Sequence, residues 1–346
     1  MVARAFITGV GGPTLSAAER SFLREAAPWG LILFTRNIET PDQVERLTAE
    51  FRDAIGNAEG PVLVDQEGGR VQRFAPPHWP RYPAGADYGE LYDRDPAAGL
   101  EAAWLGGRLI ASDLLPLGVD VDCLPLADVP AAGGDPVIGN RAYGERPDKV
   151  AAIAGAIAAG LMAGGVLPVL KHLPGHGRAT ADSHQQLPVV SATRPLLEAT
   201  DFAAFRPLAH LPMGMTAHVV FTAFDPTAPA TTSATMVAQV IRDSIGFKGL
   251  LMSDDLSMGA LSGTIGERVR AALAAGCDIA LHCNGNMMEM QQVAAEAPRL
   301  TGEPSRRAEA ALAARKSPSE IDPTEARKTF AALLAGGRPT AARMAS

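Results

Sequence analysis

Two short segments concentrate the side chains of this sequence that could carry out chemistry: KHLPGHGRATADSH at 171–184 and SDDLSM at 253–258. Within the first, Asp182 and His184 are two positions apart, so in an extended loop both side chains leave the chain on the same side. The carboxylate can then hydrogen-bond the imidazole, raise its pKa and orient the ring as a proton donor and acceptor. The alternative is a surface ion pair on a loop, without a catalytic role.

The second segment supplies two adjacent carboxylates, Asp254 and Asp255. A carboxylate is able to attack a carbon atom or stabilise a cation, a capacity that the first segment lacks. Side chains of neighbouring strand residues point to opposite faces, so only one of the two acids can face a site at the end of its strand. The residues alone do not choose between them, and the other acid is expected to cap the next helix or hold a neighbouring loop.

A further set of polar side chains would suit a sugar, because it supplies hydrogen-bond donors and acceptors without hydrophobic bulk. Arginine and lysine in such a set can also hold the carboxylates of an anionic ligand. Each arginine taken singly is equally suited to a solvated surface role, and Glu67 and Gln72 are too ambiguous to include. The set consists of Asp65, Arg73, Arg141, Lys171 and His172, in or near the glycine-rich segments DQEGGRVQR and VIGNRAYG.

Short apolar runs that alternate with helical patterns must position these groups. Strand–helix alternation predicts a parallel sheet. Eight units closing on themselves give a (β/α)8 TIM-type barrel, in which catalytic groups follow the strands. An open doubly wound sheet is the alternative, but it would more often show a glycine-rich nucleotide turn after its first strand than the TGVGGPTLS seen here. The predicted strands are AFITGV, GLILF, PVLVDQE, VDVDCLP, VLPVLKHLP, MGMTAHVVF, GLLMSDDL and DIALHCN.

Helix signals support this alternation. TPDQVERLTAEFRDAIG at 40–56 follows a threonine cap, and SATRPLLEATDFAAFRPL at 191–208 predicts a helix after a serine or threonine cap. The uncharged stretch 150–170 is interpreted as a buried helix, a glycine stop and a strand rather than a membrane span. We expect one catalytic domain over 1–300 and a helical extension over 301–346 with a mobile end.

Composition narrows the class of protein and its partners. The net charge is −7, without the basic block that tracks nucleic acid. The cysteines Cys123, Cys277 and Cys283 lack metal-ligand spacing and are expected to be buried thiols in a reducing compartment. The first apolar run is too short for a signal peptide. We therefore expect a cytoplasmic monomer that contacts neither nucleic acid nor membrane and acts on a small molecule.

Several motifs in order carry a resemblance to a known family: ILFTRNI at 32–38, VDQEGGRVQRF at 64–74, VIGNRAYG at 137–144, KHLPGHGRATADSH, MTAHVVF at 215–221 and SDDLSM. The sequence resembles the glycoside hydrolase family 3 β-N-acetylhexosaminidases, particularly their single-domain bacterial NagZ type. The resemblance covers most of the chain. It implies a retaining hydrolase that removes N-acetylglucosamine from peptidoglycan fragments, GlcNAc-1,6-anhydroMurNAc with or without peptide, in cell-wall recycling.

The resemblance also implies a role for each site residue. Asp254 falls on the family's nucleophile, and Asp182 with His184 falls on its acid/base dyad. The family's sugar-binding residues fall on the set named above: Asp65, Arg73, Arg141, Lys171 and His172. No metal or cofactor is implied, and the second acid of SDDLSM is left a supporting role.

Three alternatives remain at this point. A β-N-acetylglucosaminide phosphorylase would share the first step and the same residues. A metal-dependent barrel hydrolase would use His172, His176, Asp182 and His184 as ligands, although its first strand, AFITGV, offers none. A non-catalytic sugar-binding protein would keep the pocket without turnover.

Overall fold

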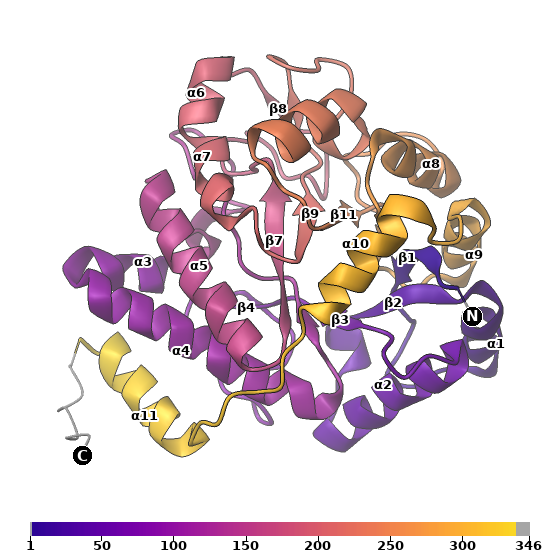
Figure 1. The fold of residues 1–346 in the computed structure, drawn as a ribbon, viewed down its shortest axis with the longest axis horizontal. Helices are drawn as coiled ribbons and strands as arrows, with labels where there is room; N and C mark the ends of the chain where they lie inside the picture. Colours follow the sequence, from indigo (N-terminus) through magenta and orange to yellow (C-terminus); the bar gives the residue numbers. More distant parts are fainter. Residues whose placement is uncertain (1, 337–346) are drawn as a thin grey trace.

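Eight parallel strands close into a barrel in the computed structural model, which describes residues 2–336. Hydrogen bonds join them in the cyclic order β1-β12-β11-β9-β7-β6-β3-β2 (Figure 1). The predicted (β/α)8 barrel is therefore confirmed, and each predicted apolar run contributes one barrel strand. Their bounds are β1 (Arg4–Thr8), β2 (Pro28–Leu33), β3 (Val62–Val64), β6 (Val121–Asp122), β7 (Leu167–Leu173), β9 (Met213–Thr216), β11 (Leu250–Asp255) and β12 (Ile279–His282).

The barrel is filled by side chains rather than open. Strands buried on both faces have continuous rather than alternating apolar sequence, and all seven residues of β7 are buried. Alternate strand residues point inward and form one apolar cluster, which includes Ile7, Ile32, Val121 and Met213. The packed interior leaves only the carboxyl ends of the strands free to build a site.

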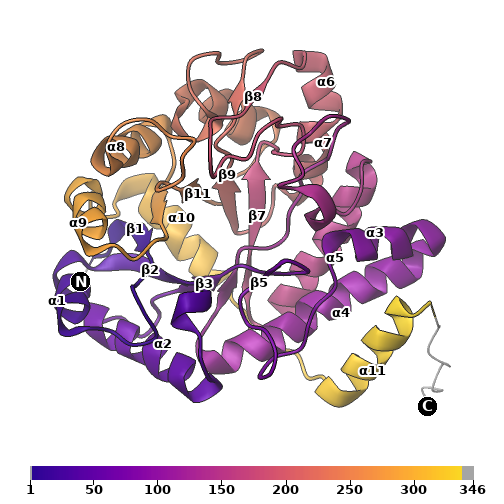
Figure 2. The ribbon, with the colours of Figure 1, turned by 180° about the vertical axis from the view of Figure 1, so that it is seen from behind.

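Helices surround the barrel strands on the outside (Figures 1 and 2). They are α1 (Ala17–Ala26), α2 (Pro41–Ile55), α3 (Gly85–Arg94), α4 (Pro96–Leu114), α5 (Pro147–Ala163), α6 (Arg194–Ala199), α7 (Asp201–Phe205), α8 (Ile265–Ala275), α9 (Met287–Glu296) and the π-helical η6 (Met236–Ser244). Single 3₁₀ turns are η1 (Thr35–Asn37), η2 (Leu115–Leu117), η3 (Gly139–Arg141), η4 (Arg206–Leu208) and η5 (Ala230–Thr232).

Local signals predicted two of these elements correctly. The hydroxyl of Thr40 accepts a hydrogen bond from the Gln43 amide at 3.3 Å at the start of α2, and the helix ends at Gly56 in a left-handed conformation. The stretch 150–170 is helix α5, a Gly164-Gly165 stop and strand β7, as predicted. No helix within residues 2–336 is long and apolar enough to cross a membrane.

The helix predicted over 191–208 is wrong as one continuous element. The chain breaks at Thr200 and forms the short helices α6 and α7. Asp201, the residue after the break, is buried and accepts hydrogen bonds from Arg178 at 3.0 Å and from the Thr200 hydroxyl at 2.7 Å. A tertiary ion pair thus overrides the helical pattern, because a buried carboxylate must be paired.

Two small sheets shape the loops above the barrel. β4 (Gln66–Gly68) and β5 (Val71–Gln72) form a hairpin directly after β3. β8 (Val189–Val190) pairs in parallel with β10 (Val220–Phe221) and joins the loops that follow β7 and β9. Both sheets therefore lie in loops that follow the carboxyl ends of barrel strands.

Two helices follow residue 300, where we expect a helical extension: α10 (Gly302–Ala313) and α11 (Pro323–Leu334). α10 crosses the barrel end opposite the site, where Ala308 and Ala311 join the inner apolar cluster (Figure 1). α11 packs beside α4, with Phe330 buried against the rings of Tyr82 and Tyr88 at centroid distances of 6.3 Å. The mobile end expected at the C-terminus falls on residues 337–346, which lie outside the described residues.

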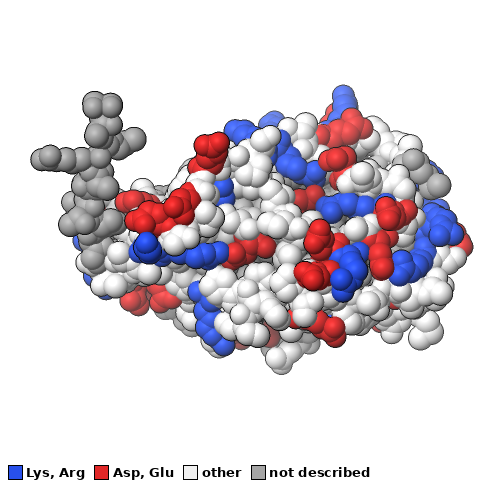
Figure 3. All heavy atoms as spheres, turned by 90° about the horizontal axis from the view of Figure 1, so that it is seen from below, with Lys and Arg blue, Asp and Glu red and all other residues white. Residues whose placement is uncertain are grey.

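Surface charge is mixed rather than separated on the face shown in Figure 3, where acidic and basic side chains lie side by side.

The packing of α11 gives a stability prediction. We expect Phe330→Ala to lower the free energy of unfolding by about 3 kcal/mol, because removal of this buried ring leaves a cavity. Lys328→Ala on the same helix, with its side chain 69% exposed, is the control and should change stability by less than about 0.5 kcal/mol. Urea unfolding of both variants measures this; equal stabilities would show that α11 contributes nothing to the fold.

Candidate active site

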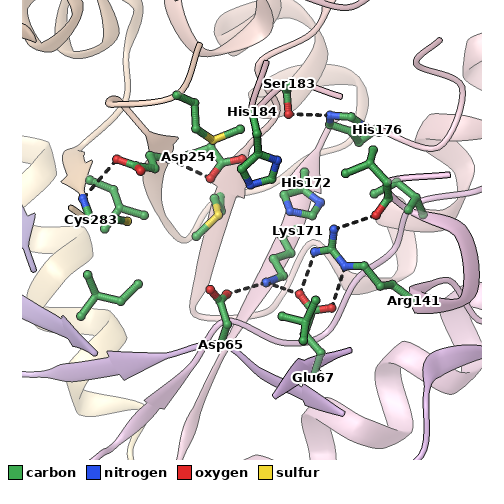
Figure 4. A pocket seen from close by; sticks show the side chains of 18 of the residues that line it. Asp65, Glu67, Arg141, Lys171, His172, His176, Ser183, His184, Asp254 and Cys283 are labelled. Atoms are coloured by element: carbon green, nitrogen blue, oxygen red, sulfur yellow. Dashed lines mark hydrogen bonds and ion pairs between the residues drawn. The ribbon is translucent and has the colours of Figure 1, made fainter. Parts of the chain in front are cut away.

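A pocket of about 380 Å³ opens at the carboxyl ends of the barrel strands. Seven of the eight predicted site residues line it; the eighth, Asp182, lies behind His184 in an adjoining polar depression. Strands far apart in sequence supply the two walls, as expected where parallel strands end together. The predicted residues that line the pocket are Asp65, Arg73, Arg141, Lys171, His172, His184 and Asp254. Other lining residues include Glu67, His176, Ser183, Asp255 and Cys283 (Figure 4).

A buried lysine organises one wall. The Lys171 ammonium at the end of β7 lies 2.9 Å from Asp65 Oδ1 and 2.7 Å from Glu67 Oε1, and its side chain is only 2% exposed. Burial alone would raise the pKa of both carboxyl groups, but Lys171, together with Arg73 at Asp65 and Arg141 at Glu67, outweighs burial and holds both pKa values below their usual range. Burial in turn opposes the charge of Lys171, whose pKa is nevertheless raised by the two carboxylates. All three groups are therefore ionised at neutral pH.

Two arginines complete this wall. Arg141 binds Glu67 with two parallel hydrogen bonds of 2.8 Å, the bidentate geometry that fixes a guanidinium in place. Arg73 donates to Asp65 at 3.1 Å, and its guanidinium lies over the Phe34 ring. Glu67 is thus a functional residue that the sequence reading left out. Its position two residues after Asp65, in the hairpin strand β4 that directly follows β3, was the signal that could have included it.

Asp254 stands on the opposite wall at the end of β11. Its carboxylate accepts a hydrogen bond from the Asp255 amide at 2.8 Å and has no side-chain partner within residues 2–336. Burial raises the pKa of Asp254, but His218, His172 and that amide together bring it below the usual value. The pocket therefore holds an anionic oxygen whose lone pairs are not committed to the protein, as a nucleophile requires.

Asp255 has the supporting role expected of the second acid. Its carboxylate accepts hydrogen bonds from the amide and hydroxyl of Ser257, at 3.0 and 2.6 Å, and from the Cys283 amide at 3.1 Å. His218 lies beneath and binds the Asp255 carbonyl at 3.0 Å through Nε2. These contacts tie the end of β11 to the end of β12 and fix the direction of Asp254.

The predicted contact between Asp182 and His184 is present, at 2.7 Å between Oδ1 and Nδ1. The extended loop assumed for it is wrong, because the segment is a turn. The Asp182 side chain also accepts from the His184 amide at 2.9 Å, while its carbonyl accepts from the Gln185 amide at 3.0 Å. Aspartate stabilises such turns with its own carboxylate. Burial raises the pKa of Asp182, but hydrogen bonds from His184 outweigh it and lower the value.

A fully buried aspartate supports two histidines that line the pocket, His172 and His176. Asp128 Oδ2 lies 2.7 Å from His172 Nδ1, and its other oxygen accepts from the His176 amide at 2.6 Å. Burial raises the pKa of Asp128, and the two histidines lower it further than burial raises it. Sequence reasoning missed this residue because it sits in the apolar run LADVP. Within residues 2–336, no group of three or more histidine, cysteine or carboxylate side chains is arranged to hold a metal ion.

Comparison with known proteins identifies the family. The model of the glycosyl hydrolase family 3 N-terminal domain matches residues 7–312. The chain belongs to this family. The β-hexosaminidase of Alkalilimnicola ehrlichii is 43% identical over 283 residues, covering 80% of this chain and 79% of the relative. That of Neisseria meningitidis serogroup C is 43% identical over 275 residues, covering 78% and 75%.

Solved structures agree with this family 3 assignment. NagZ from Neisseria gonorrhoeae superposes with a TM-score of 0.84 at 33% identity, covering 97% of each chain. A family 3 β-N-acetylglucosaminidase from a Paenibacillus species has a TM-score of 0.83 at 28% identity, covering 95% of this chain and 67% of that one. This chain is therefore a glycoside hydrolase of the NagZ-type β-N-acetylhexosaminidases.

The wall formed by Lys171, Asp65, Glu67, Arg73 and Arg141 is called the lysine wall below. Its charges predict that removal of the Lys171 ammonium lowers stability by an amount that depends on pH. We expect Lys171→Met to reduce the free energy of unfolding by about 3 kcal/mol at pH 7, because the two buried carboxylates lose the ammonium that lies between them and keep only Arg73 and Arg141 as counter-ions. In the wild type the carboxyl pKa values are lower in the folded state than in the unfolded chain, so ionisation stabilises the fold above the unfolded pKa of about 4. This contribution is lost as pH falls through the folded values.

Without the ammonium the same carboxyl groups resist ionisation and take up protons at higher pH. The deficit of Lys171→Met should therefore be largest near pH 7 and shrink as the pH approaches about 4. Urea unfolding at several pH values measures it, with exposed Lys248→Met as the control. A deficit that stays constant with pH would contradict the pairing.

Proposed function

We propose that this protein is a retaining exo-β-N-acetylglucosaminidase. It removes terminal β-1,4-linked N-acetylglucosamine from peptidoglycan fragments, GlcNAc-1,6-anhydroMurNAc with or without peptide, as a cytoplasmic monomer in cell-wall recycling. One observation carries the proposal: an uncommitted anionic carboxylate, Asp254, and a carboxylate-held imidazole, His184, border one pocket that faces a wall of sugar-binding side chains (Figure 4). The β-hexosaminidase names of the relatives support the choice of sugar.

The first step exchanges a glycosidic bond for an ester. An oxygen of Asp254 attacks the anomeric carbon, and the bond between that carbon and the leaving oxygen breaks. The leaving oxygen takes a proton from Nε2 of His184, whose Nδ1 is held by Asp182. Asp182 remains ionised and stabilises the charged imidazolium formed whenever the ring carries both protons.

The second step restores the enzyme. His184 Nε2 takes a proton from a water molecule, and the water oxygen attacks the anomeric carbon from the side that the leaving group occupied. The bond to Asp254 breaks and its carboxylate is released. Two inversions at one carbon retain the configuration of the sugar. An imidazole thus acts where most retaining glycosidases use a second carboxyl group.

The lysine wall supplies the sugar contacts. Asp65 can accept hydrogen bonds from sugar hydroxyls, Arg73 and Lys171 can donate to sugar oxygens, and His172 presents Nε2, the ring nitrogen that Asp128 does not hold. Arg141 lines the pocket, held bidentately by Glu67 and through a hydrogen bond of 3.2 Å from Nη1 to the Val137 carbonyl. The pocket volume lies near the small end of the range of about 300–1,000 Å³ for ligand sites. That size suits one terminal sugar and therefore exo cleavage.

The leaving group would occupy the open side. His184 has a side chain 63% exposed, so the second sugar and any peptide need not enter the barrel. A polar depression continues from the pocket at Arg70 and Val137 and is bordered by Gln185 and Gln186. It offers hydrogen-bonding groups to a fragment that projects outward.

Product analysis tests the reaction class. With GlcNAc-anhydroMurNAc as substrate, we expect free N-acetylglucosamine both in phosphate-free buffer and in buffer containing phosphate. Phosphorolysis is the second candidate, favoured because a neutral imidazole at the acid/base position does not repel a phosphate dianion. Formation of N-acetylglucosamine 1-phosphate only in phosphate buffer would replace the proposal with that alternative, and absence of any cleavage would favour a binding protein.

The role of Asp254 gives a mutational prediction. We expect Asp254→Asn to lower kcat/KM by at least about 10³-fold while it leaves the thermal midpoint nearly unchanged, because the variant loses the attacking group but no side-chain contact. Asp255→Asn is the matched neighbour and should lower stability through Ser257 and Cys283 while it retains more activity. If Asp255→Asn were the inactive, stable variant, the assignment would be reversed.

A further inference from the structure

We propose that His176 is a positioning residue for the acid/base group, acting through a hydrogen bond to the hydroxyl of Ser183. This inference rests on the proposed function, in which His184 delivers the proton to the leaving oxygen. Residues 182–186 are called the acid/base turn below.

Contacts within the acid/base turn fix its conformation but not its position relative to Asp254. Both polar contacts of the His184 side chain and amide go to Asp182, two residues away on the same turn. These contacts orient the ring within the turn but do not fix the distance between the ring and Asp254. A general acid must come within about 2.6–3.2 Å of the oxygen that it protonates. Contacts from outside the turn must therefore set that distance.

Two backbone contacts join the acid/base turn to the loop that follows the nucleophile strand. The Ala260 amide donates to the Ser183 carbonyl, and the Gly259 amide donates to the His184 carbonyl, both at 3.1 Å. A Cβ atom at Gly259 would lie 2.8 Å from the latter oxygen, so the two loops touch closely. This side of the turn moves together with the end of β11.

The third contact reaches into the sugar pocket and is made by a side chain. His176 Nε2 lies 3.0 Å from Ser183 Oγ, and both residues are buried, with exposures of 4% and 3% (Figure 4). His176 is the only side chain within residues 2–336 that hydrogen-bonds the side chain of Ser183. Because Ser183 lies between Asp182 and His184, this bond holds the turn at its middle.

His176 is itself anchored to Asp128, the carboxylate that also holds His172. Its amide donates to Asp128 Oδ1, while Oδ2 of the same carboxylate binds His172 Nδ1. The two imidazole rings meet edge to face, with centroids 5.9 Å apart. One buried aspartate thus links the histidine that contacts the sugar with the histidine that holds the acid/base turn.

The proton on His176 can be placed from its surroundings. Burial, aided by the neighbouring His172, lowers the pKa of His176 to about 4, so its ring is neutral at pH 7. Nδ1 is buried without a hydrogen-bond partner. A buried N–H without an acceptor is rarer than an unfilled acceptor, which places the proton on Nε2. His176 therefore donates to Ser183 Oγ, and the serine hydroxyl keeps its own proton for an acceptor in the pocket.

This arrangement predicts a loss that depends on the leaving group. A poor leaving group needs the proton from His184 in the transition state, whereas an activated phenol leaves without it. Displacement of a catalytic group by about 1 Å can cost on the order of 10²-fold in rate. Removing the bond should affect only reactions that need the proton.

The experiment compares kcat/KM, which reports formation of the glycosyl-enzyme, for two substrates. GlcNAc-anhydroMurNAc has a poor leaving group, and 2,4-dinitrophenyl β-N-acetylglucosaminide has an activated one. We expect Ser183→Ala and His176→Leu each to lose about 10- to 100-fold on the first and less than about 3-fold on the second. The double variant should lose no more than the worse single variant. His176→Gln, which keeps a donor near the position of Nε2, should recover most of the loss.

Equal losses on both substrates, additive losses in the double variant, or full activity of Ser183→Ala would each overturn the proposal. Ser183→Ala removes one oxygen and keeps the proposal testable if a His176 variant does not fold, which thermal unfolding would reveal. His184→Ala is measured alongside. If His184→Ala itself shows no dependence on the leaving group, the assigned acid/base role fails, whatever the His176 variants do.

Discussion

Lys171 carries its ammonium into the mouth of a barrel whose interior is packed with apolar side chains, where an uncompensated charge would be very costly. Asp65, directly after β3, and Glu67, in β4, surround it, and Arg73 and Arg141 bind those carboxylates. Three cations and two anions leave this wall with one net positive charge. It can therefore offer many donors to a sugar and still stand opposite an anionic Asp254.

The two reacting groups differ in how they are supported. Asp254 ends a strand and is steered by its neighbour Asp255, which is bonded to two other segments. His184 stands on a turn that is largely exposed and is held by a few contacts with the loops after β7 and β11. In the proposed double displacement, this places the attacking carboxylate on a strand and the imidazole, which would serve the leaving oxygen first and water second, on a turn.

Strand ends were the part of this molecule that local pattern could predict. Apolar runs defined all eight barrel strands, and the polar residues following them met at one mouth because parallel strands end together. Local caps likewise predicted α2. The residues that sequence reasoning missed are those whose partners are distant. Glu67 and Arg141 are 74 positions apart, and Asp128 is 44 positions from the imidazole that it orients.

Two local errors have different origins. The pattern over 191–208 reads as one helix, but the pairing of Arg178 with Asp201 breaks it at Thr200. The Asp182–His184 spacing predicted their contact correctly and the backbone wrongly, because the carboxylate caps a turn as well as binding the ring. Spacing restricts which side chains can meet, while the backbone conformation is decided by a tertiary pair in the first case and by a local carboxylate–amide contact in the second.

Covalent trapping tests the central claim most directly, namely that Asp254 attacks the sugar held by the lysine wall. The enzyme would be incubated with a 5-fluoro-N-acetylglucosaminyl fluoride, digested and mapped by mass spectrometry. The account predicts one fluoro-sugar per chain, attached to Asp254 in the peptide that contains Ser253 and Asp255. A label on Asp255 or His184, or turnover with no covalent species under conditions that slow its hydrolysis, would contradict it.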